Sequence, residues 1–338
     1  MAGRVIELPP PRGPLSEELF AKLEEPAGSR LEAPDVVPPD PLGDEDLQLA
    51  LCVAYELHYA SIRGVDEAWE WSPDLLAFRR ALEEPFEAAV AELVPAAGPG
   101  ELDSVGETLQ RIVAEDPGPP LSRYMEVQGT LEQMLEQVVH RSAYQLKEAD
   151  PHSWAIPRLT PGPKAALLEV QFDEYGGGNA ERMHSALFAR TMEGLGLDSA
   201  YGRYVDRWPA PTLAAVNLVT FFGLHRRRRG ALVGHLAAFE MTSSIPNRRY
   251  GNALRRLGFG PQVTHFYDEH VEADAVHENI AAWDLAGGLA ADEPEVAADI
   301  LFGARALLEV EARWARHLMD AWEAGETSLR SPLAPVAA

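Results

Sequence analysis

Two histidines and an aspartate, His270, Asp274 and His277, occupy positions i, i+4 and i+7 of an apolar-periodic run from Thr264 to Ala286. A helix turns by about 100° per residue, so these side chains fall within about 60° of one another on one face. Two imidazoles and one carboxylate that project together form a facial ligand set suited to iron or manganese. Taken alone, the spacing is equally compatible with a solvated polar helix face.

Two other segments place ligand-type residues where buried helices are expected. Glu148 closes a long amphipathic stretch, and Glu174 and His184 stand on either side of the run Gly176–Gly178. Three successive glycines let the backbone bend, so both flanking side chains can turn inward. Considered singly, Glu174 is typical of a surface or helix-end residue and His184 of a core histidine. Together with the triplet they supply three carboxylates and three imidazoles, enough for two divalent ions with coordination sites left for O₂.

These segments resemble a known family. The stretches 147–152, 173–178 and 266–278 are similar to the haem-oxygenase-like diiron oxidases, also described as iron-containing redox enzymes. The resemblance covers about residues 120–325. In that family one helix contributes a glutamate, a second contributes a glutamate and a histidine, and a third carries His-x₃-Asp-x₂-His.

The resemblance transfers a complete ligand set to this chain. The residues it makes metal ligands are Glu148, Glu174, His184, His270, Asp274 and His277. The first-helix residue is the weakest match, and Glu136 is an alternative to Glu148. Some members use a histidine on that helix, for which His140 and His152 are the candidates. No catalytic or cofactor-binding residue is expected beyond the ligands.

The resemblance also implies an activity. A non-haem diiron oxidase or oxygenase would bind O₂ at two ferrous ions (manganese being an alternative metal) and form a peroxo-diferric species. That species would attack a small-molecule substrate, by N-oxygenation or by oxidative C–C cleavage. A homodimer is compatible with the family. The rival hypotheses are a metal-free haem-oxygenase-like binding or interaction protein, and a single-metal or cofactorless hydrolase or synthase on the same fold.

The rest of the chain predicts helices almost throughout, because period-2 runs and hairpin turn signals are nearly absent. The expected fold is an all-α, haem-oxygenase-like bundle with an N-terminal helical extension. Four regions are predicted: a Pro-rich, disordered or extended arm at 1–45, with a short helix at 16–25; an accessory helical region at 46–118; the metal-binding domain at 119–326; and a flexible tail at 327–338. Near the C-terminal half, separate helices are expected at 226–243 and 247–257, and one helix at 262–286.

Composition narrows the classes of partner. The net charge of −24 argues against nucleic-acid binding and against attachment to anionic lipid. The absence of a long apolar run, and of a signal-like start, predicts a cytoplasmic protein without membrane spans. The lone Cys52 excludes an intrachain disulfide.

One basic run, Arg226–Arg229, stands out against this acidic background. Its arginines are expected either to pair with acidic residues of the surface or to bind a substrate carboxylate. On the helix that follows, Glu240 is a candidate for a residue that supports the ligands rather than binding metal.

Overall fold

The computed structural model describes residues 4–35, 38–116 and 118–334, except for the side chains of residues 272–276. Within these residues the protein is an α-helical bundle, as predicted, with one two-residue parallel pairing between β1 (Val5–Ile6) and β2 (Ser61–Ile62). None of the described helices is long and apolar enough to span a membrane.

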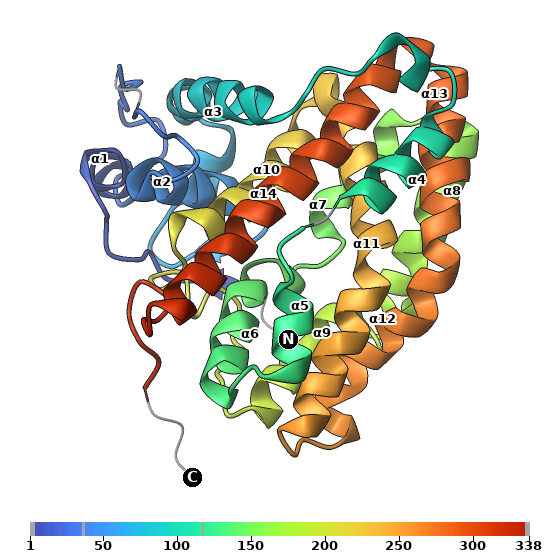
Figure 1. The fold of residues 1–338 in the computed structure, drawn as a ribbon. Helices are drawn as coiled ribbons and strands as arrows, with labels where there is room; N and C mark the ends of the chain where they lie inside the picture. The colour runs from blue at the N-terminus through green and yellow to red at the C-terminus, as the bar shows by residue number, and fades with distance from the viewer. Residues whose placement is uncertain (1–3, 36–37, 117, 335–338) are drawn as a thin grey trace.

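The centre of the bundle is the 28-residue helix α11 (Arg229–Arg256). It packs along α14 (Ala297–Glu323) on one side and along α12 (Pro261–Asn279) on the other, its two most extensive contacts. Helix α10 (Ala210–Leu224) packs on both α14 and α11 and is buried on nearly every face, which is why its sequence is apolar without a polar stripe. Figure 1 shows α14 crossing the molecule diagonally, with α8, α12 and α13 on one side of it and α1 to α3 on the other.

Shorter helices complete the bundle around this centre. They are α5 (Leu121–Val127), α6 (Leu131–Gln145), α7 (Asp150–Ser153), α8 (Pro161–Glu174), α9 (His184–Gly194) and α13 (Gly288–Asp292). The segment after residue 121 forms two helices, α5 and α6, and Thr130 caps the start of α6 by accepting a hydrogen bond from Gln133 N.

The N-terminal region contributes α1 (Pro14–Leu23), α2 (Glu45–Glu56), α3 (Pro73–Leu93) and α4 (Val105–Glu115). Helix α1 lies at the position of the short helix expected within the Pro-rich segment, and its Leu19 and Leu23 are fully buried. Helix α2 packs against α10, so this region shares a core with the rest of the chain. The division into four regions stays a prediction, because contact alone does not show whether a region folds independently.

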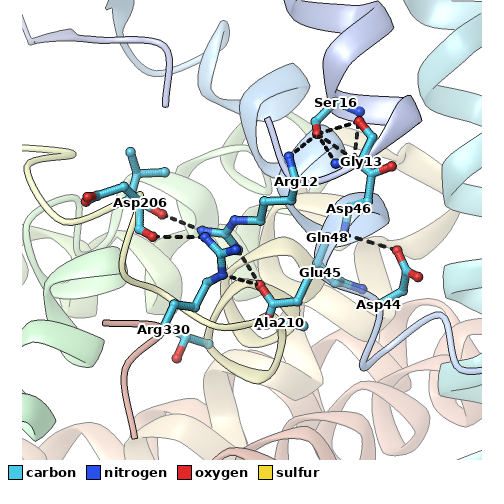
Figure 2. A network of polar contacts seen from close by, with 12 residues as sticks. Arg12, Gly13, Ser16, Asp44, Glu45, Asp46, Gln48, Asp206, Ala210 and Arg330 are labelled. Carbon is cyan, nitrogen blue, oxygen red and sulfur yellow. Dashed lines mark hydrogen bonds and ion pairs between the residues drawn. The ribbon is translucent and has the colours of Figure 1, made fainter. Parts of the chain in front are cut away.

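A polar network fastens α1 and α2 to the far end of the chain (Figure 2). The guanidinium of Arg12 is almost fully buried and donates to Glu45 Oε2 at 2.8 Å and to the Val205 carbonyl at 2.7 Å. Burial lowers the pKa of Arg12 to about 10, despite the opposing effect of Glu45. The second oxygen of Glu45 accepts from Ala210 N, and Arg330 lies 3.1 Å from Glu45 Oε2. Glu45 is therefore the shared acceptor that joins α2, α10 and the C-terminal segment.

Two helix boundaries differ from the sequence prediction. Pro246, expected to separate two helices, lies inside α11. Proline removes one intrahelical hydrogen bond, but packing of α11 against α12 and α14 outweighs that local cost. The helix expected at 262–286 is also not uniform: α12 ends at Asn279 and continues as a π-helix, η6 (Ile280–Gly287).

We expect Glu45→Ala to lower the free energy of unfolding by about 2 kcal/mol, because it leaves the buried Arg12 guanidinium without its carboxylate. Urea denaturation followed by circular dichroism would measure the loss. Glu7→Ala is the control, since its ion pair with Arg63 is exposed on both sides and should contribute about 0.5 kcal/mol or less. Equal losses in the two variants would contradict the role given to Glu45.

Candidate metal centre

A chain reversal brings Glu174 and His184 to the same side. Helix α8 ends at Glu174, and the three glycines that follow have φ values of 69°, 62° and 82°. This left-handed region disfavours residues with a Cβ. At Gly176 there is also no space, because a Cβ would lie 2.5 Å from Met183 N. The chain turns back here, so that α9 begins at His184 and the imidazole of His184 faces Glu174, as the glycine run predicted.

Glu148 lies in a strained turn. Helix α6 ends at Gln145, and Leu146–Ala149 form the turn that precedes α7. Ala149 has φ = 72°, the only positive value for a residue other than glycine among the described residues. Its carbonyl accepts hydrogen bonds from Gln171 Nε2 at 3.0 Å and from Ser153 N at 3.1 Å, which hold this backbone conformation. Such strain persists only where surrounding contacts enforce it, and it often marks functional sites.

The first cluster of potential ligands comprises Glu148, Glu174, His184 and His270, all buried, with one ligand atom from each lying within 4.8 Å of the others. His184 Nδ1 is 2.9 Å from Glu174 Oε2 and 4.0 Å from Glu148 Oε2. His270 Nδ1 donates to the Phe266 carbonyl at 2.8 Å, so in the neutral ring Nε2 carries the lone pair, and this nitrogen faces Glu148 Oε1 at 3.5 Å. This tautomer is the one a metal ligand requires.

A second cluster comprises Glu174, Glu240 and His277, again within 4.8 Å and all buried. His277 Nδ1 lies 3.5 Å from Glu240 Oε2, and its Nε2 lies 3.0 Å from Asp173 Oδ2. Glu174 belongs to both clusters, so the two sites adjoin. The side chain of Asp274, the remaining predicted ligand, lies outside the described residues.

The donor atoms of the two clusters fit divalent cations. Both oxygens of Glu148, Oε2 of Glu174, and Nδ1 of His184 and of His277 have no hydrogen-bond partner among the described residues. Although only 2.9 Å separates His184 from Glu174, the two groups are not oriented as a hydrogen bond. Buried polar atoms are normally satisfied, so unsatisfied ones in a group call for a missing partner. Carboxylate and imidazole donors without thiolates favour iron or manganese.

The charges of the buried carboxylates also call for positive partners. No lysine or arginine pairs with Glu148, Glu174 or Glu240 in the described structure. Burial raises the pKa of Glu148 and of Glu240, although His270 and His277 oppose the shift. Burial also opposes ionisation of Glu174, but the neighbouring imidazoles, His184 foremost, lower its pKa to about 2. Although burial opposes the shift, the neighbouring carboxylates raise the pKa of His184 and raise that of His277 to about 9, so imidazoles are the charge partners of these carboxylates among the described residues.

The other first-helix candidates are engaged elsewhere. Glu136 accepts hydrogen bonds from Trp322 Nε1 and Ser328 N near the C-terminus, and His140 lies between Thr212 and Ser328. His152 is buried near the clusters but contacts Tyr144 and His235 rather than the carboxylates.

The basic run Arg226–Arg229 pairs with acidic side chains of this chain. Arg227 and Arg228 both contact Glu87, and Arg229 contacts Glu293. This is the first of the two alternatives that the sequence left open.

Two features of the site escaped the sequence prediction. Glu240 was expected only to support the ligands, whereas its carboxylate belongs to the second cluster. The available signal was its position as the single carboxylate in the apolar stretch Ala231–Met241. The other feature is the buried chain Tyr144–His152–His235, with contacts of 3.3 and 3.1 Å, which lies beside the clusters. Its members come from three helices, so no local pattern joins them.

Comparison with known proteins assigns the class. Residues 135–312 match the family described as iron-containing redox enzyme, and the chain belongs to this family. This confirms the resemblance, the haem-oxygenase-like all-α fold and the assignment as an iron oxidoreductase.

A curated relative is also similar over a shorter stretch. The nitrosourea synthase of Streptomyces achromogenes subsp. streptozoticus is 31% identical over 137 residues. The aligned stretch is 40% of this chain and 29% of that protein, so this chain matches less than a third of the relative's length.

We expect Ala149→Gly to raise the free energy of unfolding by about 1 kcal/mol, because glycine adopts the left-handed conformation without Cβ repulsion. Urea denaturation of the metal-free protein would measure the gain. Ala143→Gly is the matched control within α6, where the same change should cost about 1 kcal/mol or more. A loss at position 149 would mean that the turn stores no backbone strain.

Proposed function

We propose that this protein is an O₂-dependent non-haem diiron oxidase or oxygenase that acts on a small molecule. The observation that carries the proposal is the pair of adjoining clusters, buried and rich in unsatisfied donor atoms, that share Glu174. Membership of the iron-containing redox enzyme family supports iron as the metal. The reaction outcome is proposed to be N-oxygenation or oxidative C–C cleavage, and the name of the similar nitrosourea synthase favours reaction at nitrogen.

We assign the ligands by cluster. Glu148, His184 and His270 would hold one ion, and His277 and Glu240 the other, with Glu174 between them. The family pattern makes Asp274 a further ligand. Glu240 is thereby added to the six ligands predicted from sequence. Four carboxylates against two divalent ions give a neutral centre before any bound water or substrate is counted, which suits a buried site.

Bound ferrous ions would supply two of the four electrons that O₂ takes up when one oxygen atom enters a substrate and the other leaves as water; the substrate supplies the remaining two. The protein's own part is to fix the donors and exclude water. The hydrogen bond to the Phe266 carbonyl keeps His270 Nε2 directed at the site. The contact between His277 Nε2 and Asp173 likewise keeps His277 Nδ1 directed at the second cluster. Both reduce the reorganisation that metal binding requires.

The rival function is a metal-free binding or interaction protein. Three buried carboxylates with no lysine or arginine partner among the described residues count against it, because retaining them without metal is costly. A homodimer, a cytoplasmic location and the four-region division stay predictions.

Anaerobic titration of the metal-free protein with Fe(II) is expected to reach about two ions per chain. His277→Ala should reduce the stoichiometry to about one, because it removes an imidazole from the second cluster only. Subsequent exposure to O₂ should oxidise the iron and consume O₂, which an oxygen electrode would record.

His265→Ala is the control, since His265 lies on the same helix but is exposed. Iron binding that is absent in the wild type, or unchanged in His277→Ala, would contradict the diiron proposal and favour the binding protein.

A further inference from the structure

A cavity of about 220 Å³ lies between α6, α11, α12 and α14. Several aromatic residues line it, among them Phe188, Phe239, Phe266 and Trp314. Phe266 also contacts the first cluster, because its ring centroid is 4.3 Å from that of His270. One aromatic ring therefore separates the cavity from a proposed iron ligand.

The cavity and the metal centre are lined by continuous faces of the same elements. On α6, Gln137, Arg141 and Gln145 face the cavity at intervals of four residues, which places them on one helix face. This face ends at Gln145, and the turn that follows carries Glu148 of the first cluster. On α12 the cavity residue Tyr267 precedes His270 by three positions, and on α11 Ser243 follows Glu240 by three. A ligand in the cavity would lie along these faces, with one end toward the metals.

Three buried polar atoms on the cavity wall call for a ligand. Gln137 Oε1, Gln145 Oε1 and the Tyr267 hydroxyl have no hydrogen-bond partner in the described part of the chain. The three residues are 1%, 8% and 3% exposed. A polar atom that is buried and unsatisfied destabilises the protein, and a ligand carrying hydrogen-bond donors would satisfy these three.

The cavity also contains a matched pair of charges. Arg141 donates to both oxygens of Glu311, at 2.9 and 2.7 Å, and its guanidinium lies 3.9 Å above the Trp314 ring. The pair leaves three guanidinium N–H donors and further lone pairs on the carboxylate. The remaining charged residue on the described wall, Asp116, is exposed. The inner cavity is therefore neutral overall but presents one positive and one negative group side by side.

We propose that this cavity binds the substrate of the oxidase and selects a zwitterion of the α-amino acid type, with its carboxylate at Arg141 and its ammonium at Glu311. The inference rests on the proposed function and specifies its substrate class. A ligand with only a carboxylate, such as a fatty acid, would meet repulsion from Glu311; one with only an amine would meet repulsion from Arg141. The adjacent charges of Arg141 and Glu311 complement the carboxylate and the ammonium of a zwitterion at the same time. The distance of about 12 Å from Gln137 to Gln145 along α6 leaves room for a polar side chain.

The test compares three probes with the same aliphatic chain: L-norleucine, which is a zwitterion, hexanoate, which has only the carboxylate, and pentylamine, which has only the amine. Isothermal titration of the metal-free protein is expected to show norleucine binding about tenfold or more tightly than either partial probe. In Glu311→Gln the anionic group is gone, so hexanoate should gain about tenfold relative to norleucine.

Glu293→Gln is the matched control, because it removes a carboxylate paired with Arg229 outside the cavity and should leave the order of affinities unchanged. Binding of hexanoate as tight as norleucine, no binding of any probe, or an unaltered order in Glu311→Gln would overturn the proposal. Because these measurements use neither iron nor O₂, a protein that fails to form a diiron site can still show the predicted selectivity.

A second inference follows from a different set of contacts, those on either side of Glu148. Lys147 is 1% exposed and forms an ion pair with Glu56, a residue of α2. Its ammonium lies 4.5 Å above the Tyr59 ring, and Glu56 also accepts from the Tyr201 hydroxyl at 2.6 Å. On the other side of Glu148, Asp150 pairs with Arg4 and accepts from the Tyr175 hydroxyl at 2.8 Å.

We infer that the N-terminal region positions Glu148. Arg4, Glu56 and Tyr59 all lie outside the stretch 135–312 that matches the family. They hold Lys147, directly before Glu148, and Asp150, two residues after it, and so brace the strained turn whose left-handed Ala149 would otherwise relax. Residues that orient a metal ligand commonly change metal affinity by about 10–100-fold when altered.

Glu56→Gln tests this role, because it leaves Lys147 buried without its counter-charge. We expect Fe(II) affinity for one of the two ions to fall about tenfold, and amide hydrogen exchange at residues 146–150 to become faster. Glu56→Asp, which keeps the charge, should restore part of the Fe(II) affinity and part of the slow exchange at residues 146–150.

Glu83→Gln is the matched control. Glu83 is a buried carboxylate of α3 that contacts Tyr55 and His225, away from Glu148. If both variants lower stability but alter iron binding and exchange at 146–150 equally, or if neither alters them, the positioning role is excluded. The exchange measurement on metal-free protein remains decisive even if the wild type binds no iron.

Discussion

The buried negative charge of the two clusters is the constraint on which the rest of this structure depends. Glu148, Glu174 and Glu240 approach one another in the interior without a lysine or arginine among the described residues to neutralise them. A protein tolerates such a group only if cations bind it, if the neighbouring imidazoles are protonated, or if protons stay on the carboxyls. The unsatisfied donor atoms and the family's iron dependence point to cations.

The backbone departs from regular geometry close to the residues that form this group. A left-handed alanine follows Glu148, a run of left-handed glycines follows Glu174, and a π-helix begins three residues after His277. On regular helices these side chains would be spaced out along the helix axis and would not converge on one point. Irregular turns and π-helical segments redirect them, which explains why they are concentrated at functional sites.

The surroundings of the site combine two kinds of support. The N-terminal region holds the Glu148 turn through the buried Lys147–Glu56 pair, while α11, α12 and α14 extend beyond the clusters to enclose an aromatic cavity. Pro246 belongs to that cavity wall. Its place inside α11 removes one helical hydrogen bond at a point where the helix borders open space rather than dense core. Different parts of the same bundle thus support Glu148 and enclose the cavity.

The sequence by itself determined the features that depend on local geometry. Helical periodicity gave the all-α class, the spacing of His270 and His277 placed them on one face of α12, and the glycine run indicated the reversal between Glu174 and His184. Helix pitch and glycine conformation are properties of a few consecutive residues, so they can be read without the fold. The tertiary structure alone decided that Glu148 rather than Glu136 joins the cluster, that Glu240 completes it, and that α11 continues through Pro246. These outcomes depend on which distant helices pack together, and no local pattern encodes that packing.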